Sequence, residues 1–273
     1  MDDIEPWVAS ASTWIIRQAR RYAPEVDAAG NDEPALLDTF DGHVEAVLAH
    51  FNPPIERRQT AGLVFANLYS AARKPEDDEE GWRVPSALLA AFLAAEAQFR
   101  GPLRLNTRQN ALLAEEFEDL AAQLSALALP AHAARAYRRA AALYRIIEDN
   151  DAQDRCGLAL SRARTRSLPR GGRKLLGQFS DVLCGYGYRP FRLLGWVGVQ
   201  LVAFAVLGLA LAGTSTATEA IYMVATCFLN PLGPGDTDHL HAAARPLFAI
   251  ESWAGTVSMS VFFALLVRKW FRL

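Results

Sequence analysis

Two long apolar runs near the end of the chain constrain its fold more than any other feature. Residues 193–212 contain no charged side chain and only one strongly polar residue, Gln200. About 20 helical residues at roughly 1.5 Å each cover a hydrocarbon core of about 30 Å. Residues 246–267 form a second run of similar length that contains one carboxylate, Glu251. We therefore predict two transmembrane helices, with Glu251 facing protein or water because a charge in lipid is costly.

The flanks of these runs predict an orientation in the membrane. Basic residues lie just outside both runs: Arg189, Arg192, Arg268, Lys269 and Arg272. The intervening residues 213–245 have a single basic side chain, Arg245, against three carboxylates: Glu219, Asp236 and Asp238. Because basic flanks stay on the cytoplasmic side, we expect a multi-pass protein of the cell membrane with membrane lipids around it. Both termini are then cytoplasmic and residues 213–245 lie outside.

A short apolar segment between the two runs predicts a third membrane element. Thr218 can cap a helix whose first turn contains Glu219, a carboxylate that suits the positive end of the helix dipole. The helix would continue to Phe228 and stop at Asn230-Pro231. About two to three turns are too short to span a bilayer. We therefore predict a re-entrant pore helix, followed by non-helical backbone that is buried in protein or lines water.

The same residues resemble the two-transmembrane pore-loop ion channel family, the bacterial potassium-channel-like pore domain. The similarity covers about the last third of the chain. Ala220, Tyr222 and Thr226 match the pore-helix positions of that family, and Glu251 and Gly255 match its inner helix. The end of the filter is matched by Gly233, Pro234, Gly235 and Asp236, with proline in place of tyrosine. The resemblance implies a homotetramer that conducts monovalent cations, with Thr256, Met259 and Phe263 lining the pore.

The start of the filter departs from that family. Asn230, Pro231 and Leu232 stand where threonines are usual. A potassium filter replaces the water shell of the ion with stacked carbonyl groups and a threonine hydroxyl. Proline fixes its own φ and restricts the preceding residue, which disfavours that conformation. We therefore expect a pore architecture with weak potassium selectivity.

The rest of the chain predicts helices only, so the fold class is all-α. Amphipathic periodicity favours helices over 4–22, from Pro34 to Phe51, and over 54–73, 84–99, 108–129, 131–148 and 151–167, with Pro24 ending the first. Short connections favour antiparallel neighbours. The last pair resembles a tetratricopeptide-like hairpin, but without a clean repeat upstream a generic helical bundle is an equal alternative.

Three domains follow from these patterns. Residues 1–170 would form a cytoplasmic helical domain that binds a protein or ligand of unknown kind. Residues 171–190 would form an interfacial amphipathic linker helix, which resembles the slide helix of some two-transmembrane channels. Residues 191–273 would form a two-helix transmembrane pore module with the re-entrant helix. The basic stretch 162–174 lies next to the first span, so anionic lipid is a nearer partner than nucleic acid.

Catalytic and metal-binding patterns are absent from the sequence, and we expect neither an enzyme nor a cofactor beyond permeant cations. Cys156, Cys184 and Cys227 are too isolated for a disulfide framework or a zinc site. His43, His50 and His132 favour structural or exposed roles. His239 and His241, with Asp236 and Asp238, leave two interpretations open: an outer site for divalent cations or protons, or a solvated loop.

Glu251 and Gly255 lie one helical turn apart and also have two interpretations. Glu251 could brace the filter or pore helix while Gly255 acts as a hinge or close contact, or both could be ordinary packing residues. Three functions remain open for the whole chain. The first is a cation-conducting oligomer gated or localised by its helical domain. The others are a non-conducting sensor or scaffold with the pore fold, and an effector that opens a non-selective pore when it meets a partner.

Overall fold

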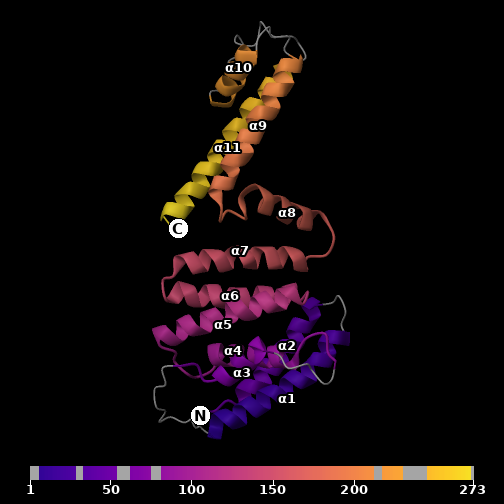
Figure 1. The fold of residues 1–273 in the computed structure, drawn as a ribbon, viewed down its shortest axis with the longest axis vertical. Helices are drawn as coiled ribbons and strands as arrows, with labels where there is room; N and C mark the ends of the chain where they lie inside the picture. Colours follow the sequence, from indigo (N-terminus) through magenta and orange to yellow (C-terminus); the bar gives the residue numbers. More distant parts are fainter. Residues whose placement is uncertain are drawn as a thin grey trace. The chain divides into compact units, whose positions relative to one another are not determined.

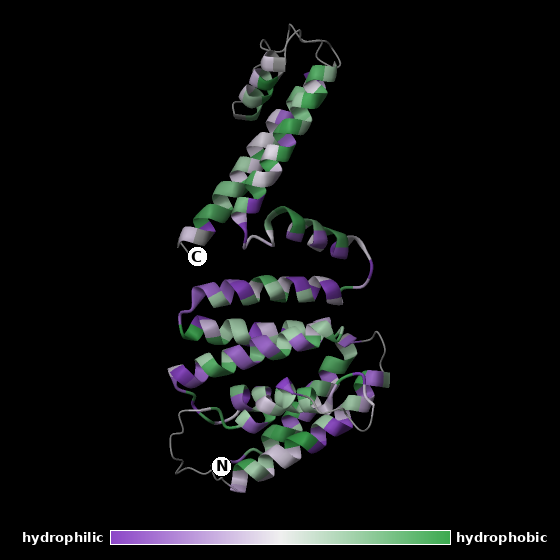
Figure 2. Cartoon of the chain, viewed as in Figure 1, coloured by the Kyte–Doolittle hydropathy of each residue, from purple (hydrophilic) through white to green (hydrophobic). Residues whose placement is uncertain are grey.

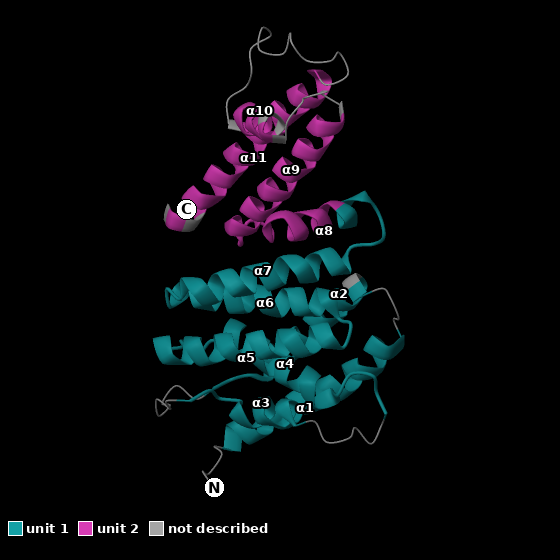
Figure 3. Ribbon diagram, turned by 45° about the horizontal axis from the view of Figure 1, so that its top comes forward, with its two compact units in different colours: residues 1–175 teal, residues 176–273 magenta. Residues whose placement is uncertain are grey.

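The chain is all-helical over the part that the computed structural model describes, residues 6–28, 33–53, 62–74, 81–211, 217–229 and 245–271. Eleven helices and no strand occur there (Figure 1). The all-α prediction is confirmed. Contacts divide the chain into two compact units, residues 1–175 (unit 1) and 176–273 (unit 2), and each is described by itself (Figure 3).

Unit 1 contains seven of the described helices and the start of an eighth. Their bounds are α1 Pro6–Ala28, α2 Glu33–His50, α3 Ala66–Arg73, α4 Ser86–Arg100, α5 Thr107–Ala126, α6 Pro130–Ile146 and α7 Asn150–Ser167. The eighth, α8 Gly172–Cys184, crosses the boundary between the units.

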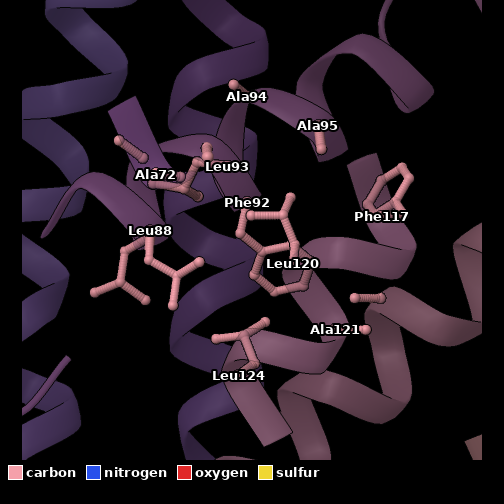
Figure 4. Packing of buried hydrophobic residues seen from close by; sticks show 14 of the residues in the cluster. Ala72, Leu88, Phe92, Leu93, Ala94, Ala95, Phe117, Leu120, Ala121 and Leu124 are labelled. Carbon is pink, nitrogen blue, oxygen red and sulfur yellow. The ribbon is translucent and has the colours of Figure 1, made fainter. Parts of the chain in front are cut away.

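Helix α4 is the centre of unit 1. Eleven of its fifteen residues are buried, because its sequence is apolar on nearly every side. It packs against α1, α2, α3 and α5. Phe92 stacks on Phe40 with ring centroids 4.6 Å apart and meets Phe117 edge-on at 6.5 Å. Figure 4 shows Phe92 and Phe117 among the leucines of α4 and α5.

Helices α5, α6 and α7 form two successive antiparallel hairpins, side by side in both ribbon views (Figures 1 and 3). Both turns use the same closure: Ala128 and Glu148 have φ of 59° and 61°, and the next amides, of Leu129 and Asp149, return to the carbonyls of Leu124 and Tyr144. Asn106 caps α5 in a reciprocal box with Gln109, and Asp149 caps α7. The predicted helices 108–129, 131–148 and 151–167 correspond to these three elements.

Two predicted helices in unit 1 have the wrong bounds. α1 continues through Pro24 to Ala28 instead of ending before it. Tyr22, Ala23 and Val26 are fully buried, and their burial outweighs the cost of about 3 kcal/mol of an interior proline. Of the helix predicted over 54–73, residues Ala66–Arg73 are helical and residues 62–65 are not, while residues 54–61 lie outside the described part.

Unit 2 contains α9 Pro190–Leu211, α10 Ala217–Leu229 and α11 Arg245–Phe271, besides most of α8. The windows Pro190–Ala210 and Arg245–Arg268 are long and apolar enough to cross a membrane, which matches the two predicted runs. Figure 2 shows mainly hydrophobic residues along α9, in contrast with the mainly hydrophilic α7. The amphipathic linker helix predicted over 171–190 ends early, at Cys184, because Gly185, Tyr186 and Gly187 all have positive φ.

Candidate functional site

Helices α9 and α11 form an antiparallel hairpin whose contacts occur at three levels. Near the end of α9 and the start of α11, a Cβ added at Gly208 would lie 3.6 Å from the Phe248 ring. In the middle, the Ser258 hydroxyl donates a hydrogen bond to the Gln200 side chain at 3.3 Å. Just before α9, Arg268 of α11 lies over the Tyr188 ring, 5.2 Å from its centroid. A Cβ at Gly208 would thus make only an ordinary contact, and the Gln200–Ser258 hydrogen bond joins the two helices at mid-length.

The short helix α10 packs against both members of this hairpin. Val224 and Cys227 of α10 are buried with Phe248 of α11, and residues of α9 surround them: Leu201, Phe204 and Ala205. α10 begins at Ala217, slightly before the predicted cap Thr218, and ends at Leu229, directly before the predicted stop at Asn230-Pro231. Its 13 residues extend about 20 Å, too short for a bilayer core of about 30 Å.

The end of α10 lies against Gly255. A Cβ at Gly255 would be 2.6 Å from the Phe228 carbonyl oxygen and 2.9 Å from the Phe228 ring, so any larger residue forces the two helices apart. One turn earlier in α10, Val224 is buried in the same cluster as Phe248 of α11. From Val224 to Phe228, α10 therefore runs in the same sense as α11 from Phe248 to Gly255. Gly255 is ten residues beyond Arg245, about 15 Å along α11 and half the depth of a bilayer core.

Glu251 is on the same face of α11 as Phe248 and Gly255, at spacings of three and four residues. Its exposed fraction is 0%, so the side chain faces protein within unit 2. Neither carboxylate oxygen has a hydrogen-bond partner among the residues that the structure describes. Burial of a polar group without a partner is costly, which makes Glu251 the most unusual polar side chain of this unit.

The other predicted pore residues fall into three groups. Tyr222 is 70% exposed on α10, and the Thr226 hydroxyl donates to the Tyr222 and Met223 carbonyl oxygens. Thr256 and Phe263 are exposed on α11 and Met259 is half-buried. Ala220 is on α10. The predicted filter residues lie outside the described part, as do the residues of the outer cluster: Asn230, Pro231, Leu232, Gly233, Pro234, Gly235, Asp236, Asp238, His239 and His241.

Helix α8 has an apolar face that is exposed to solvent among the residues that the structure describes. Leu175, Leu176, Phe179 and Val182 are 47–70% exposed, and no residue of α8 is buried. Its C-terminal end is attached to the first turns of α9, because the Trp196 indole N–H donates to the Val182 carbonyl oxygen at 3.1 Å. The amphipathic face thus ends where the apolar helix α9 begins.

The three cysteines are free thiols. Burial raises the pKa of Cys156 to about 12, so this thiol stays protonated and unreactive. Within the described ranges, no group of three or more histidine, cysteine and carboxylate side chains could hold a metal ion.

The sequence allows Ser258 to pack against residues 197–208 of the first run, but the individual pairs of the site were not predicted. Gln200 and Ser258 are 58 residues apart, and the sequence signal for their pairing is limited to one amide in an apolar run and small polar residues in the other. Gly208 gives a comparable signal, a small residue in a spanning helix.

Comparison of the chain with protein-family models, with curated proteins and with solved structures finds no match. The resemblance to two-transmembrane channels rests on the residues quoted for it.

Proposed function

We propose that this chain is an ion channel-like membrane protein that assembles into a cation-conducting oligomer. The outer surface of unit 2 supports insertion into a bilayer. Large apolar side chains of α9 and α11 are exposed, for example Val202 at 66% and Trp253 at 69%. Exposed apolar surface of this extent is stable in lipid or against other copies of the chain, and costly in water.

The position of the end of α10 carries the proposal. In a bilayer-spanning hairpin, the contact of Phe228 with Gly255 brings this helix end about halfway through the core. The last carbonyl groups of a helix lack partners within it, and they form the negative end of the helix dipole. Non-helical backbone at that depth is tolerated where it is buried in protein or lines water. A re-entrant helix with its negative end at mid-depth favours a cation in a water-filled path.

An oligomer is needed because one copy contributes only two spans and one short helix among its described residues. Exposed Thr256 and Phe263 leave one side of α11 available to other copies. The family resemblance favours four copies. Residues 213–245 have three carboxylates against one arginine, so the outer mouth of an oligomer concentrates cations. With asparagine, proline and leucine in place of filter threonines, potassium and sodium both pass.

Helix α8 couples unit 1 to this pore. It connects the two units along the chain, and its exposed apolar face fits the boundary between headgroups and acyl chains. Arg173 and Lys174 at its start gain energy from anionic lipid. A stimulus received by unit 1 then reaches α9 through this helix.

Planar-bilayer recording of the purified protein under asymmetric potassium and sodium tests the proposal. We expect cation currents with a reversal potential that shows little preference between the two ions. Gly255→Ala should abolish them, because the added methyl displaces the end of α10. Gly198→Ala is the matched control, since a Cβ there meets no atom within 4 Å.

Three outcomes would contradict the proposal. Absence of current in wild-type protein that is folded and oligomeric favours a non-conducting sensor or scaffold. Equal currents in both glycine variants remove the role of the α10–α11 contact. An anion preference contradicts the electrostatic argument.

A further inference from the structure

A polar cavity opens between helices α2 and α6 of unit 1. Its volume is about 710 Å³, which is within the range of ordinary ligand-binding pockets. Of the residues that line it, three are carboxylates, two are apolar and four are arginines: Arg100, Arg135, Arg138 and Arg139. No aromatic side chain is among these lining residues. The cavity therefore offers charged and hydrogen-bonding groups rather than a stacking surface.

Three of the four arginines are held by carboxylates. Arg135 donates to both oxygens of Asp41 in α2, at 2.8 and 2.6 Å. Arg139 donates to both oxygens of the fully buried Glu96 in α4, at 3.0 and 3.1 Å. Arg100, at the end of α4, lies 3.4 Å from Asp41. Paired arginines of this kind have little freedom to move, so the wall of the cavity is organised before any ligand arrives.

Arg138 differs from the other three, because no carboxylate among the described residues pairs with it. The charges that act on it are all positive. Partial burial, followed by the charges of Arg164, Arg139 and Arg135, lowers the pKa of Arg138 from its ordinary value, and the guanidinium still keeps its proton at neutral pH. Arg164 of the neighbouring helix α7 likewise has no ion pair within the described ranges. Two uncompensated positive charges therefore lie beside this cavity.

We propose that the cavity binds a phosphorylated small molecule whose phosphate group is held by Arg138. A phosphate monoester carries a charge of about −1.5 to −2 at neutral pH, which matches the two uncompensated arginines. The planar guanidinium group donates two parallel hydrogen bonds to such a group. Asp38 of α2 also lines the cavity without an ion pair in the described part, and it can accept from hydroxyl groups elsewhere on the ligand. A sugar phosphate has both features.

Calorimetric titration of the full chain in nanodiscs of neutral lipid tests the site. Glucose 6-phosphate and inorganic phosphate are the probes, and glucose is the control that lacks phosphate. We expect saturable binding of both probes, weakened by added salt, and no binding of glucose. The site lies wholly in unit 1, so this result does not depend on conduction. Absence of saturable binding of both probes, or equal binding of glucose, would overturn the proposal. If phosphatidic acid in the nanodisc competes with glucose 6-phosphate, the phosphate comes from a lipid headgroup, which overturns a soluble ligand.

Two arginine variants of the same helix test the role of Arg138. Arg138→Gln removes the guanidinium without breaking a described ion pair, so affinity for glucose 6-phosphate should fall by about tenfold or more. Arg145→Gln is the matched control, since it removes an equally exposed arginine of α6 that does not line the cavity.

Thermal unfolding of the same proteins separates binding from folding. Without ligand, wild type and both variants should unfold at similar temperatures. Glucose 6-phosphate should raise the unfolding temperature of unit 1 in wild type and Arg145→Gln but not in Arg138→Gln, because only a bound ligand stabilises the folded state. Wild-type affinity in Arg138→Gln, or an equal loss in Arg145→Gln, would show that Arg138 does not hold the phosphate.

Discussion

Unit 1 shields the apolar side chains of α4 almost completely, whereas unit 2 leaves those of α9 and α11 exposed along their length. Each unit contains a helix that is apolar on nearly every side, α4 in unit 1 and α9 in unit 2, so an apolar sequence alone does not tell these two helices apart. The difference lies in what can cover an apolar helix. In unit 1 that cover is other helices of the same chain, and in unit 2 the described residues leave it open; under the proposed function, lipid or further copies would supply it.

The two units also treat buried charge differently. Glu96 and Glu251 both have an exposed fraction of 0%. Glu96 is bonded to Arg135 at 3.1 Å and to Arg139 at 3.0 Å, and the hydrogen bond of Arg135 to Asp41 lowers the pKa of that second carboxyl. Glu251 has no partner among the described residues. A buried charge in unit 1 is thus part of a network, whereas the one in unit 2 is set against apolar helices.

The largest expected effect separates these two glutamates. Glu96→Ala leaves two guanidinium groups without their carboxylate, so the free energy of unfolding of unit 1 should fall by about 3–5 kcal/mol. Glu251→Gln removes a charge without a described partner, so unit 2 should be as stable as in wild type or more stable. Deuterium exchange of the amides of α4 and α11, recorded as the temperature rises, measures the stability of unit 1 and of unit 2. A comparable loss at Glu251 would mean that a residue outside the described part pairs with it.

The second effect compares two exposed aliphatic residues. Val202 of α9 and Ile146 of α6 are 66% and 63% exposed. An aspartate at the centre of a lipid-facing helix costs about 2.5–3.5 kcal/mol, so Val202→Asp should reduce membrane integration strongly. Ile146→Asp on a water-facing surface should change stability by less than about 0.5 kcal/mol. Alkaline extraction of membranes measures integration, and equal behaviour of the two variants would remove the distinction between the units.

The smallest effect concerns α8, which belongs partly to each unit. Leu176→Glu exchanges an apolar contact worth about 1.5–3 kcal/mol for a charge, so it should detach α8 from the interface. Gln178→Glu adds the same charge at an exposed polar residue of α8 and should have little effect. Single-channel recording should show a shifted open probability with unchanged unitary conductance for Leu176→Glu only. Unchanged gating would mean that the coupling runs elsewhere, and altered conductance would mean that α8 borders the ion path.

The spacing of apolar residues predicted most helices, because a helix that buries one face must repeat apolar side chains at helical intervals. α6 and α7 have nearly the predicted bounds, and α9 and α11 coincide with the apolar runs. The errors have local causes. Pro24 was expected to end α1, but the helix continues because the residues around and after it are buried. The end of α8 was missed because it needs three successive residues of positive φ, and Tyr186, a residue type that rarely adopts positive φ, gave no sign of it. The position of Phe228 against Gly255 followed from neither residue alone.

The sequence by itself determined the helical content, the two apolar runs and the short helix between them, because these depend on residues close together in the chain. Tertiary structure decided which polar groups meet. His132 had no partner at helical spacing, yet it lies between Tyr22 and Glu33, 110 and 99 residues away. Likewise, only packing brought the end of α10 to the middle of α11. Hydrogen bonds and steric contacts act over a few ångströms, and the separations in the chain that they bridge leave no periodic signal in the sequence.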